Sequence, residues 1–272
     1  MKKSHQLNGK SVHWKIWTSS VVTDSRFLEG HMHQVAEWTR QLIDAWYAVT
    51  GITSGAVQVW RNMIPGSTDR AHLSTLGQIE LYEQWRRVFR TCGLKVGQIL
   101  LQWGRMPRPL VHQVQAHAEM GTVPLCNEND AYDIWQILGL NNGSDNDANM
   151  PVVDRLQRRA WFDVIAGISF TQLPGVLDDD DITVQIRETI SRKVIRAYKS
   201  YAFEWSSPGG TGGINSKIDN LAKVVRKNTR FGVIAEPFRW FDVSPGDSAT
   251  FLFRDQCDVQ LEDTLLSVLL KT

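Results

Sequence analysis

The segment Gly209–Lys217 has the composition of a polyphosphate-binding turn. Four glycines and a threonine precede a helical pattern, and a lysine falls in the first turn of that helix. Backbone N–H groups at a helix N-terminus attract phosphate, and a nearby cationic side chain strengthens the attraction. A flexible loop that leads into a helix has the same composition, so the segment alone leaves both interpretations open. The nucleotide-binding candidates here are Thr211, Gly212, Gly213, Ile214, Asn215, Ser216 and Lys217.

A second candidate phosphate turn follows the first extended segment of the chain. Lys15 lies near the end of that segment, and the small hydroxyl residues Thr18–Ser20 come directly after it. A strand that ends in such a turn can present backbone N–H groups to phosphate. Glycine is the usual residue where backbone approaches a ligand closely, but Trp17 stands at that place. The stretch alone therefore leaves the phosphate interpretation open.

Two further clusters carry oxygen ligands. "NEND" covers Asn127–Asp130 and "SDND" covers Ser144–Asp147. Their carboxylate and amide oxygens could bind an ammonium group or Mg²⁺, although solvated loops have the same composition. His31 and His33 form an HxH pattern at the start of a predicted helix, and this pattern does not indicate a metal site.

Composition indicates an ordinary globular protein. The 272 residues are 42% hydrophobic and 22% charged, with a formal net charge of +1. Such a balance does not indicate a nucleic-acid or membrane-surface binder. Cys92, Cys126 and Cys257 are odd in number and far apart, so they give no disulfide framework or zinc motif. We expect reduced thiols, a cytoplasmic location and no membrane partner, because no secretory signal or apolar run of about 20 residues occurs.

Extended and helical patterns alternate along the whole chain. This alternation predicts one α/β domain over residues 1–272, a three-layer αβα sandwich with a mainly parallel central sheet. In such folds ligands bind at the carboxyl ends of the strands, where several of the polar clusters fall. Strands are expected over 11–17, 46–53, 95–103, 121–127, 161–171, 230–236 and 249–253. Helices are expected over 31–46, 68–91, 109–120, 152–160, 183–203 and 214–228.

The clusters occur in the order found in one enzyme family. The chain resembles the glutamate 5-kinases of the amino acid kinase family over about residues 12–253. The segment Leu76–Leu101 matches the family's "GQ" helix and the strand after it, and "ATFLF" is a weak echo of its last strand motif. The remaining matching motifs are "KIWTSSVVTD" from Lys15, "TSGA" from Thr53, "VPLCNEND" from Val123, "SDND" from Ser144 and "GTGGINSK" from Gly210.

The resemblance implies an amino acid kinase fold and a defined reaction. Members transfer the γ-phosphoryl group of ATP, with Mg²⁺, to the side-chain carboxylate of L-glutamate, the first step of proline biosynthesis. It also implies a cytoplasmic homo-oligomer, a dimer or a tetramer. Many members carry a C-terminal PUA domain, whereas residues 254–272 are expected to form only a short tail.

The resemblance also implies roles for individual residues. Lys15 and Lys217 would neutralise the phosphoryl group in transit, and Asp147 would orient the two lysines. Thr171 and Gln172 would line the nucleotide together with Lys15 and the segment Thr211–Lys217. The residues that would hold glutamate are Ser54, Gly55, Asn127, Asp130 and Asn146, with Asp130 facing the ammonium group.

Three of the departures from the family pattern bear on activity. Trp17 and Trp60 stand where the family has glycine, and Gln172 stands where it has an acidic residue. These departures define an alternative, a weakened or inactive homologue that acts as a binding or regulatory protein. Another alternative is a kinase of the same fold for a different small acid, but "NEND" is the substrate-side cluster most particular to the glutamate enzymes.

Overall fold

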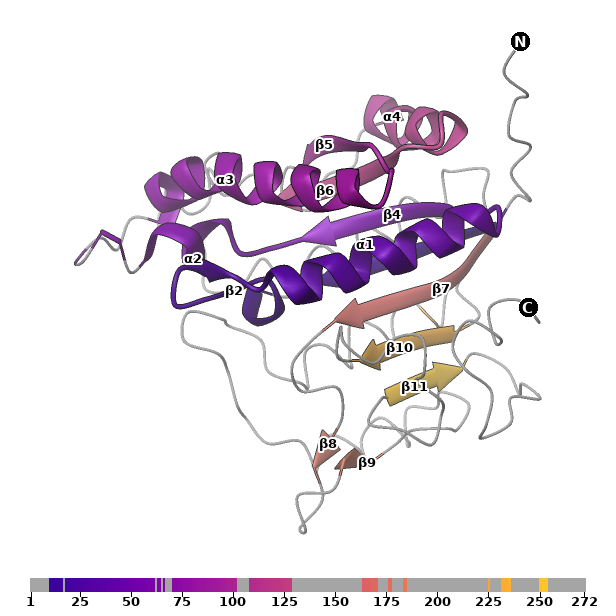
Figure 1. The fold of residues 1–272 in the computed structure, drawn as a ribbon. Coiled ribbons are helices and arrows are strands. Elements are labelled where there is room, and N and C mark those ends of the chain that lie inside the picture. The colour runs from indigo at the N-terminus through magenta and orange to yellow at the C-terminus, as the bar shows by residue number, and fades with distance from the viewer. Residues whose placement is uncertain are drawn as a thin grey trace.

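The computed structural model describes residues 10–16, 18–61, 63–64, 66, 70–101, 108–128, 163–170, 176–177, 183–184, 225, 231–235 and 250–253. Seven strands form one sheet in the order β11-β10-β7-β1-β4-β6-β5 (Figure 1). All neighbouring pairs are parallel except β10 and β11. The predicted α/β class with a mainly parallel sheet is therefore confirmed. The strands are β1 (Lys10–Ile16), β4 (Ala48–Thr53), β5 (Val96–Leu101), β6 (Val123–Glu128), β7 (Asp163–Phe170), β10 (Phe231–Ala235) and β11 (Thr250–Phe253).

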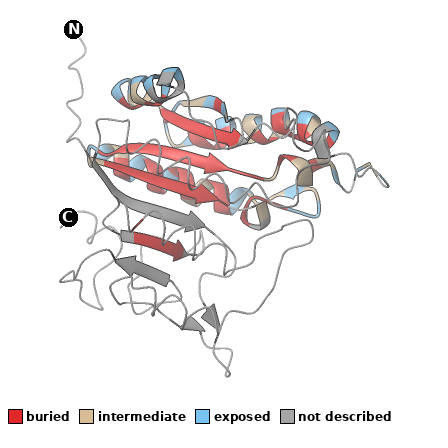
Figure 2. Cartoon of the chain, turned by 180° about the vertical axis from the view of Figure 1, so that it is seen from behind, coloured by how far each residue is buried: buried red, intermediate tan, exposed pale blue. Residues whose placement is uncertain are grey.

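Strand β1 lies in the centre of the sheet, between β4 and β7. All of its residues after Lys10 are buried, as expected for a parallel strand that is covered on both faces. Strands β1 and β4 are coloured as buried in Figure 2. Because side chains alternate along a strand, β1 divides into two sets. Val12, Trp14 and Ile16 share one face, and Ser11, His13 and Lys15 share the other.

Two helices cover the face of Trp14, namely α1 (Glu29–Asp44) and α3 (Arg70–Thr91). The indole N–H of Trp14 donates to the Thr39 hydroxyl of α1 at 3.1 Å. Its ring centroid is 5.8 Å from that of Trp85 and 6.4 Å from that of Phe89, both in α3. An aromatic cluster therefore fixes both helices on the centre of the sheet, at spacings typical of attractive ring pairs.

A glycine in the neighbouring strand makes room for this cluster. Gly51 of β4 is the register partner of Trp14. A Cβ atom at Gly51 would lie 2.3 Å from Cζ2 of Trp14, closer than real side chains approach. The indole of Trp14 therefore occupies the volume that a side chain at position 51 would need.

Helix α4 (Arg108–Glu119) covers the opposite face of the sheet. Gln98 of β5 pairs with Leu125, which pairs with Gly51, so these three share the face of Trp14. Gly97 therefore points to the other face, and a Cβ there would lie 2.0 Å from Cε1 of His117 in α4. In the described part of the chain, helices thus lie on both faces of the sheet.

Several short elements were not predicted from the sequence. They are the 3₁₀ turn η1 (Thr18–Ser20), β2 (Val22–Thr23), β3 (Arg26–Phe27), α2 (Ala56–Arg61), β8 (Val176–Leu177) and β9 (Thr183–Val184). The predicted helix over 183–203 is wrong at its first two residues, because Thr183 and Val184 pair with β8 as an antiparallel strand. β-Branched residues favour strand over helix. The helices expected over 152–160 and 214–228 lie outside the described residues, apart from Val225, which is helical and buried. None of the described helices is long and apolar enough to span a bilayer.

Candidate functional site

The candidate site lies at the carboxyl ends of three neighbouring strands, β1, β4 and β6. Lys15 is the second-last residue of β1, Ser54 and Gly55 directly follow β4, and Asn127 is the second-last residue of β6. Because parallel strands end at the same edge of a sheet, the fold brings these four predicted residues to one edge. The register supports this placement, since Ile52 pairs with both Lys15 and Cys126.

Lys15 has no solvent exposure. Its register partners are Ile52 of β4 and Ser169 of β7, so its backbone lies between two strands in the middle of the sheet. A buried ammonium group is costly unless an opposite charge or several hydrogen bonds compensate it. Lys15 therefore places a buried cationic side chain near the carboxyl end of β1.

The turn after β4 is bound to the end of β1. The Ser54 hydroxyl donates to the backbone oxygen of Ile16 at 3.2 Å and accepts from the Thr18 hydroxyl at 3.3 Å. Gly55 has φ +119°, a conformation that side chains rarely adopt, and a Cβ there would lie 3.3 Å from Cγ2 of Val22. The turn thus needs its glycine and sits at a fixed place beside Lys15.

The 3₁₀ turn η1 closes the end of β1. The Val21 N–H donates to the Thr18 oxygen at 2.9 Å. Nδ1 of His31, at the start of α1, lies 3.0 Å from the Ser20 oxygen, so it carries a proton and donates. His31 therefore anchors the turn through the backbone. The buried Ser20 hydroxyl has no hydrogen-bond partner among the described residues, which leaves a polar group in the turn for a ligand to satisfy.

Strand β6 contributes a buried amide and a buried thiol. Asn127 is 7% exposed at the carboxyl end of the strand. Burial raises the pKa of the Cys126 thiol to about 12. Cys126 is therefore a neutral core residue at physiological pH, and the thiolate needed for nucleophilic catalysis is not available there.

Other predicted site residues lie outside the described residues, so their places stay predictions. Strand β7 ends at Phe170, which pairs with Ile16, so the chain leaves β7 at the edge that holds Lys15. The residues concerned are Trp17, Asp130, Asn146, Asp147, Thr171, Gln172, Thr211, Gly212, Gly213, Ile214, Asn215, Ser216 and Lys217.

Trp60 departs from the family pattern and is part of the packing. It lies in α2, and its indole N–H donates to Oε1 of Glu80 in α3 at 3.1 Å. Its ring packs against the core cluster. The indole thus links two helices.

Sequence reasoning missed the hydroxyl contacts that hold the turn after β4. The Thr18 contact with Ser54 joins residues 36 apart, and the indole N–H of Trp85 donates to the Thr53 hydroxyl across 32 residues. The small hydroxyl residues of "TSS" and "TSGA" were the visible signal, but only the strand order shows that they meet.

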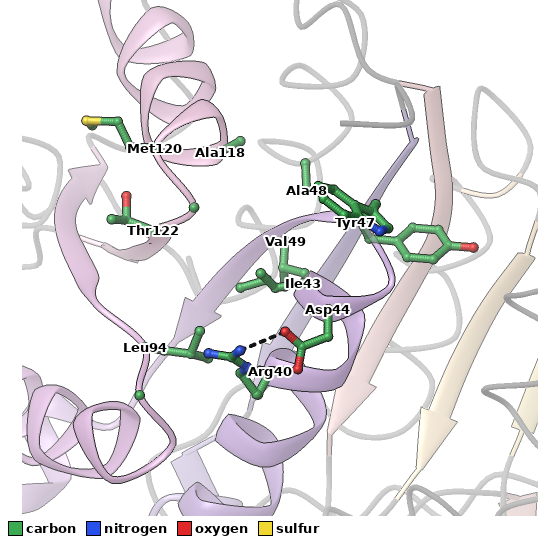
Figure 3. Close-up of a pocket in the computed structure, with 13 residues that line it drawn as sticks. Arg40, Ile43, Asp44, Tyr47, Ala48, Val49, Leu94, Ala118, Met120 and Thr122 are labelled. Atoms are coloured by element: carbon green, nitrogen blue, oxygen red, sulfur yellow. Dashed lines mark hydrogen bonds and ion pairs between the residues drawn. The ribbon is translucent and has the colours of Figure 1, made fainter. Parts of the chain in front are cut away.

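A cleft of about 240 Å³ lies at the opposite edge of the sheet (Figure 3). It lies between the end of α1, the start of β4 and the turns that precede β5 and β6. Arg40 and Asp44 of α1 form an ion pair at 2.8 Å on its wall. Because these elements meet at the amino ends of the strands, the cleft contains none of the predicted site residues.

Comparison with known proteins gives a consistent group of relatives. The chain is 27% identical over 232 residues to the glutamate 5-kinase of Lactococcus lactis subsp. lactis, covering 80% of this chain and 84% of the relative. It is 27% identical over 230 residues to that of Streptococcus thermophilus (79% and 84%). The Methanosarcina mazei glutamate 5-kinase is 28% identical over 228 residues, covering 78% of this chain and 55% of that longer protein. No protein-family profile matches the chain.

Proposed function

We propose that this chain is an ATP-dependent kinase of the amino acid kinase fold, a three-layer αβα sandwich, that phosphorylates the side-chain carboxylate of L-glutamate. One observation carries the proposal. Lys15, Ser54, Gly55 and Asn127 meet at the carboxyl edge of a parallel sheet, in a chain similar to several glutamate 5-kinases over about four-fifths of its length.

The reaction needs positioned charge more than covalent catalysis. A carboxylate oxygen of glutamate attacks the γ-phosphorus of ATP, the bond from that phosphorus to the β,γ-bridging oxygen breaks, and ADP leaves with the electron pair. Lys15, with Lys217, stabilises the negative charge on the phosphoryl group in transit. Asp147 orients the two lysines. Mg²⁺ enters with the ATP phosphates, and we assign it no protein ligand.

The remaining residues bind the two substrates. The backbone N–H groups of Ser54 and Gly55 hold a carboxylate of glutamate, since the Ser54 hydroxyl proton is donated to Ile16, and Asp130 faces its ammonium group. Asn127 and Asn146 complete the glutamate site. The nucleotide contacts Thr171, Gln172 and the segment Thr211–Lys217, whose glycines let the backbone approach the phosphates.

A weakened or inactive homologue is the second candidate. Trp17 favours it, because an indole in a phosphate turn can fill the space of the γ-phosphate, and Gln172 removes an acidic residue of the family pattern. Trp60 does not favour it, because its indole is bound to Glu80 of α3.

A coupled assay separates the two candidates. Purified protein with ATP, Mg²⁺ and glutamate should release ADP, and with hydroxylamine present it should form glutamyl hydroxamate. Binding of ATP without glutamate-dependent ADP release would overturn the kinase proposal and support the inactive homologue. A panel of other small acids tests the remaining alternative, since a better acceptor than glutamate would reassign the substrate.

The turnover of Trp17→Gly tests the importance of the departure at that position. An increased rate means that the indole limits the phosphate turn in the natural chain. An unchanged rate means that the turn tolerates the indole.

A further inference from the structure

We propose that Trp85 of α3 is a positioning residue for the glutamate site and acts through Thr53 on the Ser54–Gly55 turn. This inference rests on the proposed function and adds to it a residue with no motif of its own. Trp85 has no solvent exposure and lies eight residues after Gly77, in the middle of a helix that covers the sheet.

Two consecutive hydrogen bonds lead from Trp85 to the backbone of Ser54, and a third holds the Ser54 side chain. The indole N–H of Trp85 donates to Oγ1 of Thr53 at 2.8 Å. The Thr53 hydroxyl in turn donates to the backbone oxygen of Ser54 at 3.5 Å. The Ser54 hydroxyl donates to the oxygen of Ile16 at the end of β1. Every hydroxyl proton in this series has one assigned acceptor, so the donors and acceptors are mutually consistent.

The indole N–H determines how the Thr53 hydroxyl is oriented. Because Trp85 supplies a donor, the Thr53 oxygen accepts from it and its own proton is left to point at Ser54. Thr53 is 2% exposed, so water cannot replace the indole without a rearrangement. Loss of the N–H therefore frees the Thr53 hydroxyl to rotate and weakens the hold on the turn.

Trp85→Phe is the direct test, because it keeps an aromatic ring in the cluster and removes the N–H. We expect the KM for glutamate to rise about fivefold, the change that the loss of about 1 kcal/mol of net hydrogen-bond energy predicts. We expect kcat and the KM for ATP to change less than about twofold, because the chemistry and the nucleotide site keep their groups.

Trp14→Phe is a matched control. Trp14 is equally buried, contacts Trp85, and also donates its indole N–H to a threonine, but that threonine is Thr39 in α1. Both variants lose an indole from the same cluster, so they should lower the melting temperature similarly. Only Trp85→Phe should raise the KM for glutamate. An equal rise in both variants would mean that Trp85 acts only through packing and would overturn the proposal.

Variants at Thr53 test the connection itself. Thr53→Val keeps the shape and removes the hydroxyl, whereas Thr53→Ser keeps the hydroxyl. We expect Thr53→Val to reproduce the defect of Trp85→Phe and Thr53→Ser to retain the wild-type KM. The double variant Trp85→Phe with Thr53→Val should be no worse than either single variant, because both remove the same connection. Additive defects would overturn the proposal.

Amide hydrogen exchange gives a readout that does not depend on kinase activity. If Trp85 positions the turn, the amides of residues 54–56 should exchange faster in Trp85→Phe and at the wild-type rate in Trp14→Phe. Equal exchange in wild type and Trp85→Phe would overturn the proposal even in an active enzyme. Faster exchange in a protein that does not use glutamate would retain the positioning role and reject only the proposed function.

Discussion

At the scale of single residues, His13 is a neutral histidine in the centre of the sheet. It lies two residues before Lys15 on the same face of β1 and is 5% exposed. Its Nε2 is 3.4 Å from the Ser11 hydroxyl, and its Nδ1 has no hydrogen-bond partner among the described residues. Burial lowers the pKa of His13 from 6.5 to about 4. Between these two values the unfolded chain binds a proton that the native protein does not bind.

This difference predicts a loss of stability in mild acid. The contribution of His13 is fully present above pH 6.5 and is lost as the pH falls toward 4. Its full size is on the order of 3 kcal/mol. Denaturant unfolding at pH 7 and at pH 4.5 measures it, and His13→Gln should lose less free energy of unfolding between the two pH values than wild type. His112→Gln, at an exposed position of α4, is the control, and an equal loss in His13→Gln and wild type contradicts the prediction.

Gly51→Ala should strongly destabilise the folded protein, although the substitution adds only one methyl group. The new Cβ would lie 2.3 Å from the Trp14 ring, so the indole or the strands must move. We expect a loss of about 2 kcal/mol in the free energy of unfolding. Trp14→Phe removes the ring atoms nearest to that methyl group, so the double variant should lose less than the sum of the two single variants. Additive losses contradict this account.

At the scale of elements, three helices end in the same hydrogen-bonded motif at the amino edge of the sheet. The second residue after each helix has a left-handed φ, which is 67° at Trp46, 72° at Gly93 and 65° at Gly121. Each motif pairs two backbone N–H groups with carbonyls of the last helical turn, the arrangement that usually selects glycine. The bonds are Trp46 to Ile43 and Tyr47 to Leu42 after α1, Gly93 to Arg90 and Leu94 to Phe89 after α3, and Gly121 to Ala118 and Thr122 to His117 after α4.

Position 46 should therefore reverse the usual preference of helices for alanine over glycine. We expect Trp46→Gly to be about 1 kcal/mol more stable than Trp46→Ala, because a left-handed backbone conformation is strained for alanine and not for glycine. Glu37, exposed inside α1, is the control, and there the alanine variant should be more stable by about 1 kcal/mol. Thermal unfolding of the four variants checks both orders, and the same order at both positions contradicts the motif.

The elements that sequence analysis predicted are those with long periodic patterns. Helices α1, α3 and α4 each present a regular apolar stripe, and β1 and β4 are apolar runs bounded by turn residues. Helix α2 has six residues, too few for a periodic pattern, and it packs closely on α3, where a Cβ at Gly77 would lie 1.9 Å from the oxygen of Ala56. Its formation depends on that tertiary contact. Thr183 and Val184, which form β9, were predicted to be helical. Their pairing with β8 outweighed the helical pattern of the sequence that follows.

At the scale of the whole molecule, the two edges of the sheet differ in what they offer. The carboxyl edge holds Lys15 and the hydroxyl-bound turn after β4, whereas the amino edge holds the cleft beside the Arg40–Asp44 ion pair. Parallel topology made the first edge predictable, because consecutive motifs fall after consecutive strands. The contacts of Ser54 with β1 were not predictable, because they depend on the distance between strands that are far apart in the sequence.

Ligand binding should protect only one of the two edges. With ATP, Mg²⁺ and glutamate present, we expect slower amide exchange at residues 18–20 and 54–56, which border Lys15. Residues 46–48, 93–94 and 121–122 at the cleft should exchange at the rate of the free protein. Protection confined to the cleft would place the ligand at the amino edge and contradict the proposed site.

The fit between Trp14 and Gly51 also constrains how this chain can have evolved. Because the indole occupies the space of a side chain at position 51, a tryptophan at position 14 is accommodated best when position 51 is glycine. Replacement of the glycine while the tryptophan remains should carry the loss of about 2 kcal/mol expected for Gly51→Ala. The sizes of the two residues are therefore coupled, and a relative that carries a larger residue at position 51 should carry a smaller one at position 14.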